Sequence, residues 1–348
     1  MNWVPTWEIS KIYKIFRKIL FLFPPEVSQS LSHIFLNAFS WLYKSKQTSF
    51  SVKGLKVKNR LGLAAGLDKN ARQVKQFDEI GFGFIEVGTI TPNAQYGNQK
   101  PRVQRLIKEE SLLNSLGFPN DGVEKIKARL SKVSKEICLG VNIGPNKDTG
   151  PDNIINDYLF CYKELHEYAD FVTLNISSPN TPNLRKLHNV ESFTKIIKAI
   201  LLERELHATK PKILIKLSPD EEVSSYRNII NTINQTDIDG VIISNTTNDE
   251  ILKEQLNVGH LPGGISGKSL RNSSNKILKE IKSIISNEKI IVAVGGVFDV
   301  DSYNEKFELG ADLVQMYTGL IYEGPNLVKR IIENDKQISR NSWVSIKS

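Results

Sequence analysis

The sequence has few of the side chains that build metal clusters and disulfide frameworks. It contains two cysteines and five histidines among 348 residues. So few cysteines exclude a disulfide scaffold and any zinc or iron–sulfur site made from a cysteine cluster. No apolar run approaches the roughly 18 residues that a spanning helix needs, and the N-terminus lacks the small-residue cleavage site of a secretory signal. These absences indicate a folded chain in a reducing compartment.

Acidic side chains are outnumbered by basic ones. Lysine and arginine total 46 against 38 aspartates and glutamates, a formal net charge of +8. Such a surplus favours anionic partners, such as phosphate groups, acidic metabolites, nucleic acid or anionic lipid. The alternative is that the lysines only cover solvated faces, so the local clustering of charge is more informative than the total.

Residues 1–45 contain two successive amphipathic helix patterns. Apolar residues recur at spacings of three and four between Ile12 and Phe23, and again between Val27 and Leu42. Pro24 and Pro25 separate the patterns, because proline ends one helix and is tolerated in the first turn of the next. Basic residues and tryptophans accompany the first pattern, as in helices that lie on membranes. We expect a helical hairpin that attaches to a membrane surface; the alternative is that both apolar faces pack on the main domain.

From residue 61 onward, short apolar runs alternate with helical patterns. The eight runs are 61–66, 84–89, 137–144, 171–177, 212–218, 240–246, 289–296 and 313–319. Near-continuous hydrophobicity is typical of parallel strands buried on both faces, and eight strand–helix units favour a closed barrel. The sequence therefore predicts the α/β class: a (β/α)₈ TIM barrel over residues 46–340, with the helical pair 1–45 as an N-terminal extension. Residues 51–60 predict a small hairpin across the bottom of the barrel.

Two connections between a strand and its helix are unusually long. They cover residues 90–120 and 248–268, the second of which ends in the glycine-rich stretch GGISG. In a barrel such loops lie at the C-terminal face, where active sites are built. We expect these long loops to be lids over the site.

The C-terminal ends of the eight runs carry amides, hydroxyls, glycines and two lysines. This set is a poor one for a metal ion, which needs carboxylate or imidazole ligands, so we expect no metal. It suits a large polar heterocycle with anionic groups. Gly296 and Gly319 end the seventh and eighth runs, where such barrels bind phosphate, although glycine is also common there for steric reasons.

Lys216 lies inside an apolar run, where an uncompensated charge is costly. It is expected to meet electron-rich or anionic atoms of a cofactor, the alternative being an ion pair with an acid of the barrel. For Lys69, an ion pair with the adjacent Asp68 is the corresponding alternative.

Six motifs together resemble the dihydroorotate dehydrogenase family, over nearly the whole chain and in the family's order. They are LGLAAGLDK at 61–69, NSLGF at 114–118, NISSPNTP at 175–182, SNTT at 244–247, GGISG at 263–267 and QMYTG at 315–319. The likeness is greatest to the membrane-associated, quinone-reducing class 2, which also has an N-terminal helical pair. The resemblance implies an FMN enzyme that oxidises dihydroorotate to orotate, the fourth step of pyrimidine biosynthesis.

The resemblance also assigns site residues. FMN would be held by Ala65, Gly66, Lys69, Thr89, Asn142, Asn175, Lys216, Ser244, Gly267, Gly296, Tyr317 and Thr318. The substrate would be surrounded by Lys69, Asn114, Ser115, Leu116, Gly117, Phe118, Asn175, Asn180, Asn245 and Thr246. A ring of asparagines suits a substrate edge of alternating N–H and C=O groups, since each amide donates and accepts.

Ser178 is the catalytic base that the resemblance implies: it would remove the C5 proton while C6 delivers hydride to the flavin N5. From the residues alone Ser177 and Ser178 are equally good candidates, and either could instead cap a helix. A serine is a weak base and needs a proton exit, for which the resemblance suggests a water-linked route past Thr181 and Phe118. Family members that use fumarate or NAD have a cysteine as base, whereas Cys138 and Cys161 lie elsewhere.

The resemblance further implies ubiquinone or menaquinone as electron acceptor, in an apolar slot formed by the helical pair. Arg102 would meet the quinone carbonyl with help from Tyr317. Gln29 stands where many relatives have histidine, and His33 follows one helical turn later, which leaves the quinone contacts open. We expect a monomer attached peripherally to the cytoplasmic side of the cell membrane.

Three other readings compete with this one. A soluble class 1 dihydroorotate dehydrogenase would use fumarate or NAD. A flavin barrel acting on a dihydropyrimidine or on dihydrouridine in RNA is a second, but the sequence has no appended RNA-binding segment, so we expect no nucleic-acid partner. A non-catalytic phosphate-binding barrel at the membrane surface is the third.

Overall fold

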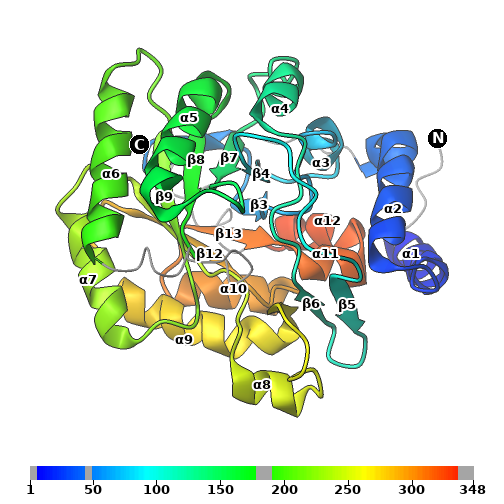
Figure 1. The fold of residues 1–348 in the computed structure, drawn as a ribbon. Coiled ribbons are helices and arrows are strands. Elements are labelled where there is room, and N and C mark those ends of the chain that lie inside the picture. The colour runs from blue at the N-terminus through cyan, green and yellow to red at the C-terminus, as the bar shows by residue number, and fades with distance from the viewer. Residues whose placement is uncertain (1–5, 44–48, 178–189, 336–348) are drawn as a thin grey trace, which may run out of the picture.

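A closed barrel of eight parallel strands forms the centre of the computed structural model, which describes residues 6–43, 49–177 and 190–335 (Figure 1). The strands follow one another around the barrel in chain order, with β13 closing against β3. They are β3 (Leu61–Leu63), β4 (Phe84–Ile90), β7 (Leu139–Ile143), β8 (Phe171–Asn175), β9 (Lys212–Leu217), β10 (Gly240–Ile243), β12 (Ile290–Val294) and β13 (Leu313–Met316). Seven lie within one of the expected runs and β4 extends one residue beyond its run, so the predicted barrel is confirmed.

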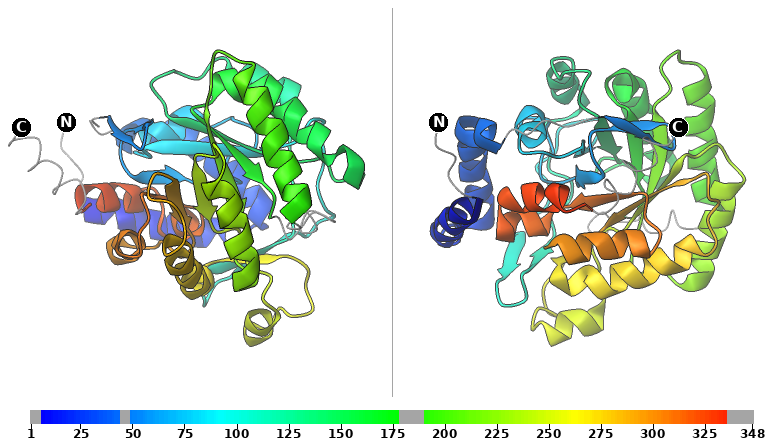
Figure 2. Two further views of the ribbon diagram at one scale, coloured as in Figure 1. Left: turned by 90° about the vertical axis from the view of Figure 1, so that its left-hand side faces the viewer. Right: turned by 180° about the vertical axis from the view of Figure 1, so that it is seen from behind.

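Helices surround the barrel and bury one apolar face each against the strands (Figures 1 and 2). They are α3 (Val74–Glu79), α4 (Val123–Leu130), α5 (Ile154–Leu165), α6 (Val190–Glu205), α7 (Val223–Asn234), α9 (Arg271–Lys282), α10 (Val300–Glu308) and α12 (Asn326–Glu333). A short helix, α11 (Thr318–Glu323), stands between β13 and α12. The expected boundary between residues 45 and 46 lies outside the described residues, and so does the expected end at residue 340.

The barrel interior is filled in layers. In the lowest layer the rings of Phe84 and Phe171 meet edge to face, with centroids 6.2 Å apart. Gly62 and Gly140, on the strands beside them, leave room for these rings: a Cβ would lie 2.3 Å from the Phe84 ring and 2.0 Å from the Phe171 ring. Because strand side chains alternate between faces, the residues two positions further on form the next layer. Its members include Glu86, Asn142, Thr173, Lys216 and Gln315, all buried.

The N-terminal ends of the strands are closed by a hairpin and by charged side chains. The predicted hairpin is present as β1 (Phe50–Val52) and β2 (Leu55–Val57), whose Val52, Leu55 and Val57 join the lowest layer. Three aspartates each lie directly before a different strand. Each accepts a hydrogen bond of 2.8 Å from a backbone N–H of the strand next to its own. These pairs are Asp170 with Leu139, Asp239 with Ile213, and Asp312 with Ile291.

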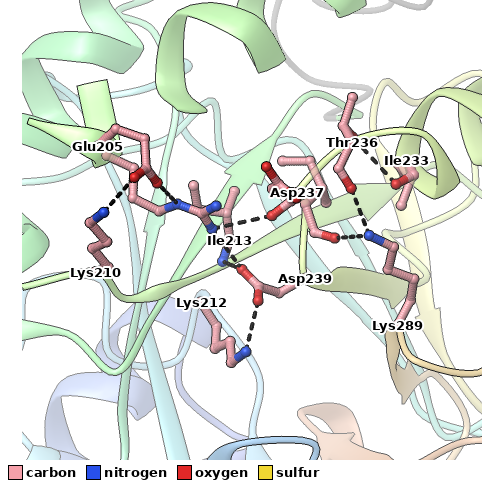
Figure 3. Close-up of polar contacts among 11 residues, drawn as sticks. Glu205, Lys210, Lys212, Ile213, Ile233, Thr236, Asp237, Asp239 and Lys289 are labelled. Atoms are coloured by element: carbon pink, nitrogen blue, oxygen red, sulfur yellow. Dashed lines mark hydrogen bonds and ion pairs between the residues drawn. The ribbon is translucent and has the colours of Figure 1, made fainter. Parts of the chain in front are cut away.

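Figure 3 shows the surroundings of one of these aspartates, Asp239. Asp239 also accepts hydrogen bonds from Lys212 Nζ at 2.8 Å and from Arg204 Nη1 at 3.1 Å. Beside it, Lys289 Nζ donates to the backbone oxygens of Thr236 and Ile238, both at 2.7 Å. These contacts fix the strands at the end of the barrel that lies away from the C-terminal face.

The N-terminal helical pair is confirmed as α1 (Thr6–Leu20) and α2 (Pro25–Phe39), followed by a short 3₁₀ turn, η1 (Ser40–Tyr43). The pair lies on one flank of the barrel beside α11 and α12 (Figures 1 and 2). Tyr13 Oη donates to Ile321 O at 2.8 Å, and Arg17 Nη1 donates to Tyr322 O at 2.5 Å. Among the described helices, none is long and apolar enough to span a membrane.

The apolar side chains of this pair divide into a buried group and an exposed group. Leu20 and Leu36 are buried against the rest of the molecule. Other apolar side chains are exposed, among them Leu22 at 83% and Ile34 at 65%. The hairpin thus keeps a second set of apolar side chains that the described part of the chain does not cover. Its further exposed members are Ile15, Ile19, Phe23, Val27, Phe39, Trp41 and Leu42.

The two long connections, which we expect to be lids, contain strands. They pair with each other in an antiparallel sheet of three strands, β5 (Val103–Leu106), β6 (Ser111–Asn114) and β11 (Gly264–Gly267), in the order β11-β6-β5. A short helix, α8 (Glu250–Gln255), precedes β11. Because β11 bonds to β6 along its length, both segments are fixed walls at the C-terminal face.

Candidate active site

The C-terminal ends of the barrel strands open into a cavity of about 980 Å³, counting the part open to solvent. Of the expected cofactor residues, the cavity is lined by Ala65, Gly66, Lys69, Thr89, Asn175, Lys216, Ser244, Gly267, Gly296, Tyr317 and Thr318. Of the expected substrate residues, it is lined by Lys69, Asn114, Leu116, Gly117, Phe118, Asn175, Asn245 and Thr246.

Four expected site residues are placed differently or not described. Asn142 is fully buried beneath the cavity rather than in its wall. Ser115 is held by its backbone, its N–H donating to Arg102 O at 2.8 Å, and it lies behind the described lining. Ser178 and Asn180 lie outside the described residues, so their positions remain predictions.

A hydrogen-bonded chain of side chains lies under the cavity floor. Asn142 Nδ2 donates to Glu86 Oε1 at 2.8 Å, and Asn142 Oδ1 accepts from Thr89 Oγ1 at 2.6 Å. Asn175 Nδ2 donates to Thr89 Oγ1 at 3.0 Å and to Asn142 Oδ1 at 3.2 Å. Gln315 Nε2 reaches the other oxygen of Glu86 at 2.6 Å.

The chain continues toward the substrate residues. Asn245 Nδ2 donates to Asn175 Oδ1 at 3.3 Å and to Ser177 Oγ at 3.2 Å. Asn245 Oδ1 accepts the backbone N–H of Thr246 at 2.8 Å. The orientation of each amide is therefore fixed by its neighbour before any ligand enters.

Glu86 is the residue that the sequence analysis missed. It lies inside the second run, below the C-terminal end of that strand, and it is fully buried. The available signal was an acidic side chain at an inward-facing position of an otherwise apolar strand, where an unpaired charge is costly.

Two lysines bring positive charge into the cavity. Burial lowers the pKa of Lys216, and the facing Glu86 carboxylate opposes that effect. Burial and the Arg102 guanidinium lower the pKa of Lys69 to about 8, with Glu26 and Asp68 acting in the other direction. Lys69 Nζ donates to Gly66 O at 2.6 Å. Within the described part of the chain neither lysine forms an ion pair, so both charges are available to a ligand.

Glycines form part of the wall of the cavity. At Gly296 (φ +73°) a Cβ would lie 2.4 Å from Arg271 Cβ, and at Gly319 it would lie 2.0 Å from Val297 O. Only glycine therefore allows these turns to pack as they do, and their backbone N–H groups stand beside the cavity. Together with the unpaired Lys216 and the amide-rich floor, this wall fits a large phosphorylated heterocycle such as FMN. No group of three or more metal-ligating side chains occurs among the residues described.

A second cavity, of about 1040 Å³, lies between the helical pair and the barrel. Apolar side chains dominate its lining, including Phe16, Leu20, Phe35, Leu36 and Ile321. Leu116 and Tyr317 line both cavities, so the two spaces share a wall.

Few polar groups enter this second cavity. Gln29 Nε2 donates to Leu67 O at 3.0 Å, and burial lowers the pKa of His33. Arg105 and Glu26 line the cavity, whereas Arg102, which forms an ion pair with Glu26 at 2.7 Å, is not among the lining residues. The assignment of Arg102 to a quinone carbonyl remains a prediction.

Comparisons with known proteins agree on one family. The family model described as dihydroorotate dehydrogenase matches residues 47–338. The chain is 38% identical over 333 residues to "Dihydroorotate dehydrogenase (quinone)" of Buchnera aphidicola subsp. Schizaphis graminum, covering 92% of this chain and 99% of the relative. It is 39% identical to the protein of that name from Vibrio parahaemolyticus, covering 81% and 85%. A crystal structure of DHODH from Eimeria tenella in complex with ferulenol superposes with a TM-score of 0.83 at 32% identity, covering 92% of this chain and 93% of that one.

Proposed function

Because the chain belongs to the dihydroorotate dehydrogenase family, we propose that it oxidises dihydroorotate to orotate in pyrimidine biosynthesis and passes the electrons to a quinone. The observation that carries this proposal is the pair of cavities with a common wall. One cavity is polar and lies at the catalytic face of the barrel, and the other is apolar and opens under the helical pair. A polar ring substrate and an apolar electron acceptor therefore each have a separate compartment.

FMN is the cofactor that we assign to the barrel cavity. The backbone beside Gly296 and Thr318 would hold its phosphate, and Lys216 would face the ring. When bound, FMN accepts the hydride that leaves C6 of dihydroorotate. Asn142, being buried, would act from below by orienting Thr89 and Asn175.

The substrate would lie against the remaining amides. Asn114, Asn175 and Asn245 present donors and acceptors to a ring with alternating N–H and C=O edges. The carboxylate of dihydroorotate would pair with Lys69, whose charge has no other carboxylate partner among the described residues. Thr246, Phe118 and Asn180 complete the assignment.

Ser178 is the base that we assign to the C5 proton. Ser177, its neighbour, is buried and accepts a hydrogen bond from Asn245, which gives it a separate positioning task. A hydroxyl is a weak base, so the rate depends on a route by which the proton leaves for water.

The apolar cavity is the quinone site that we propose. Tyr317 stands in the shared wall, and Gln29, His33 and Arg105 supply the polar atoms near a head group. The exposed apolar side chains of α1 and α2 would enter the surface of the bilayer, with Lys14 and Lys18 beside them. We propose a monomer attached peripherally at the cytoplasmic side.

The test is an anaerobic stopped-flow experiment on the purified protein, mixed first with dihydroorotate and then with a short-chain ubiquinone. The account expects loss of flavin absorbance in the first step and rapid recovery in the second. Recovery only with fumarate or NAD would overturn the quinone assignment. A yellow protein that dihydroorotate does not bleach would overturn the substrate, and a colourless protein would overturn the cofactor.

A further inference from the structure

Glu86 lies directly under the proposed site yet lines neither cavity. Its side chain is fully buried in the second interior layer of the barrel. Its two oxygens accept hydrogen bonds from two different strands, one from Asn142 Nδ2 at 2.8 Å and one from Gln315 Nε2 at 2.6 Å. A carboxylate in such a place needs a reason, because burial of a charge is costly.

The carboxylate decides which way Asn142 points. An amide has a donor end and an acceptor end, and a carboxylate only accepts. Asn142 must therefore turn its Nδ2 toward Glu86, which leaves Oδ1 to accept from Thr89 Oγ1 and Asn175 Nδ2.

The same constraint passes along the chain to the substrate side. With its Nδ2 used in this way, Asn175 presents Oδ1 to Asn245 Nδ2 at 3.3 Å. Asn245 in turn directs Oδ1 to the Thr246 N–H at 2.8 Å. Glu86 therefore still sets the donor and acceptor pattern at Asn245, which follows β10, four strands away around the barrel.

Glu86 also faces the charge that the cavity floor carries. Lys216, on β9, is the cation that the Glu86 carboxylate acts upon, and it is buried in the same layer. Thr173 Oγ1 and Gln315 Oε1, also in this layer, are buried without a partner among the described residues. Among the described side chains of this layer, Glu86 is the one that accepts hydrogen bonds from amides on two different strands.

We propose that Glu86 is a positioning residue of the reaction, whose carboxylate fixes the direction of the amide chain on which the flavin and the pyrimidine ring rest. The inference rests on the proposed function, and it concerns residues for which the comparisons assign no role.

Glu86→Gln is the direct test, since it keeps the shape and replaces one acceptor by a donor. Asn142 and Gln315 both donate to this position, so one of them would meet a second N–H group. If Asn142 turns, its Nδ2 faces Asn175 Nδ2, and the reversal spreads to Asn245. We expect the dissociation constants of FMN from the apoprotein and of orotate from the holoenzyme each to rise at least about tenfold.

Two further variants distinguish an effect on the direction of the amide chain from an effect on the packing of the buried layer. Thr173→Val alters the same buried layer at a hydroxyl that has no partner among the described residues, so its affinities should stay within about twofold of wild type. The double variant Glu86→Gln with Gln315→Glu moves the carboxylate to the other side of the pair. Position 86 can then donate to position 315 and still accept from Asn142, so most of both affinities should return.

An NMR measurement on the FMN-free protein reports directly on the side-chain amides of the chain. The side-chain ¹⁵N–¹H signals of Asn142 and Asn175 should move in Glu86→Gln, remain in place in Thr173→Val, and return in the double variant. Unmoved amide signals, or affinities of Glu86→Gln equal to those of Thr173→Val, would overturn the inference. A double variant whose affinities for FMN and orotate stay as low as those of Glu86→Gln would also overturn it. If Glu86→Gln does not fold, a double variant that does not fold either would have the same consequence. Wild-type protein that binds neither FMN nor orotate would instead overturn the proposed function, and the amide signals would still decide the role of Glu86.

Discussion

At the residue scale, burial changes the pKa of individual side chains that would contact an anionic ligand. Lys69 is the clearest case, because burial and Arg102 bring its pKa down to about 8. Its Nζ is anchored on Gly66 O at 2.6 Å, so the charge is held in place while it still lines the cavity. A lysine with this pKa is mostly charged at pH 7 and loses its proton just above physiological pH.

This predicts that orotate binding weakens as the pH rises through about 8. Below that pH the free enzyme has a charged Lys69 ready for the carboxylate, and above it a proton must first be taken up. Titration of flavin absorbance with orotate between pH 6.5 and 9 measures this dependence. Lys69→Met should bind weakly and with little pH dependence over the same range. A wild-type affinity that is constant from pH 6.5 to 9 would contradict the assignment.

The two adjacent serines make a matched pair of variants. Ser178→Ala should retain FMN and orotate but slow flavin reduction by dihydroorotate by about 10²–10⁴, the usual contribution of a general base. Ser177→Ala removes only an acceptor for Asn245 Nδ2 and should slow the same step by less than about tenfold. Rapid-mixing traces of both variants would refute the assignment if their order were reversed.

At the element scale, the sequence predicts the strands and helices that have a local pattern, but it does not predict pairing between strands that are far apart in the chain. The eight strands, the helical pair and the hairpin β1–β2 follow from apolar runs, helical spacing and proline positions, which are local signals. The sheet of β5, β6 and β11 does not, because β6 and β11 are separated by about 150 residues and no local pattern specifies their pairing. Glu86 escaped notice for a related reason, since its partners lie on other strands.

A buried lysine between two helices gives an element-scale prediction about stability. Lys306 on α10 is fully buried and donates to Ser274 Oγ at 2.9 Å and Asn275 Oδ1 at 2.6 Å on α9. Burial lowers its pKa to about 7, although Glu305 opposes this. The unfolded chain therefore binds the proton more tightly than the folded one between about pH 7 and pH 10.5, and this lysine makes stability rise with pH across that window.

Lys306→Met should remove that part of the pH dependence. Wild-type stability relative to the variant is expected to increase by on the order of 2 kcal/mol from pH 7 to pH 9.5. Urea unfolding at several pH values measures the difference. A difference between the two proteins that stays constant with pH, or falls, would show that Lys306 keeps an ordinary pKa.

At the scale of the whole molecule, the arrangement separates two kinds of chemistry. The barrel supplies a polar cavity with fixed amides, and the helical pair adds an apolar cavity against it. Leu116 and Tyr317 line both cavities, so the proposed function places its two substrates in separate spaces that share a wall. The pair also carries exposed apolar side chains, which would meet a membrane in the proposed function.

This surface predicts attachment to lipid vesicles. Leu22→Glu combined with Ile34→Glu places charge on two of its most exposed apolar residues and should abolish most co-sedimentation with vesicles of phosphatidylcholine and phosphatidylglycerol. Ile251→Glu with Leu202→Glu changes equally exposed residues elsewhere and is the control. Equal sedimentation of the two double variants would contradict the proposed attachment.

The measurement that tests the two-cavity account most directly is the rate of each half-reaction in a protein whose apolar cavity is filled. Ser32 lines that cavity and not the polar one, so Ser32→Phe obstructs only the proposed quinone site. Ser30→Phe makes the same change on α2 at an exposed serine that does not line the apolar cavity. The account predicts that Ser32→Phe is reduced by dihydroorotate at the wild-type rate and reoxidised by ubiquinone at least about tenfold more slowly, while Ser30→Phe changes neither rate. If Ser32→Phe left quinone reoxidation at the wild-type rate, or slowed both steps alike, the two cavities would not be the two sites.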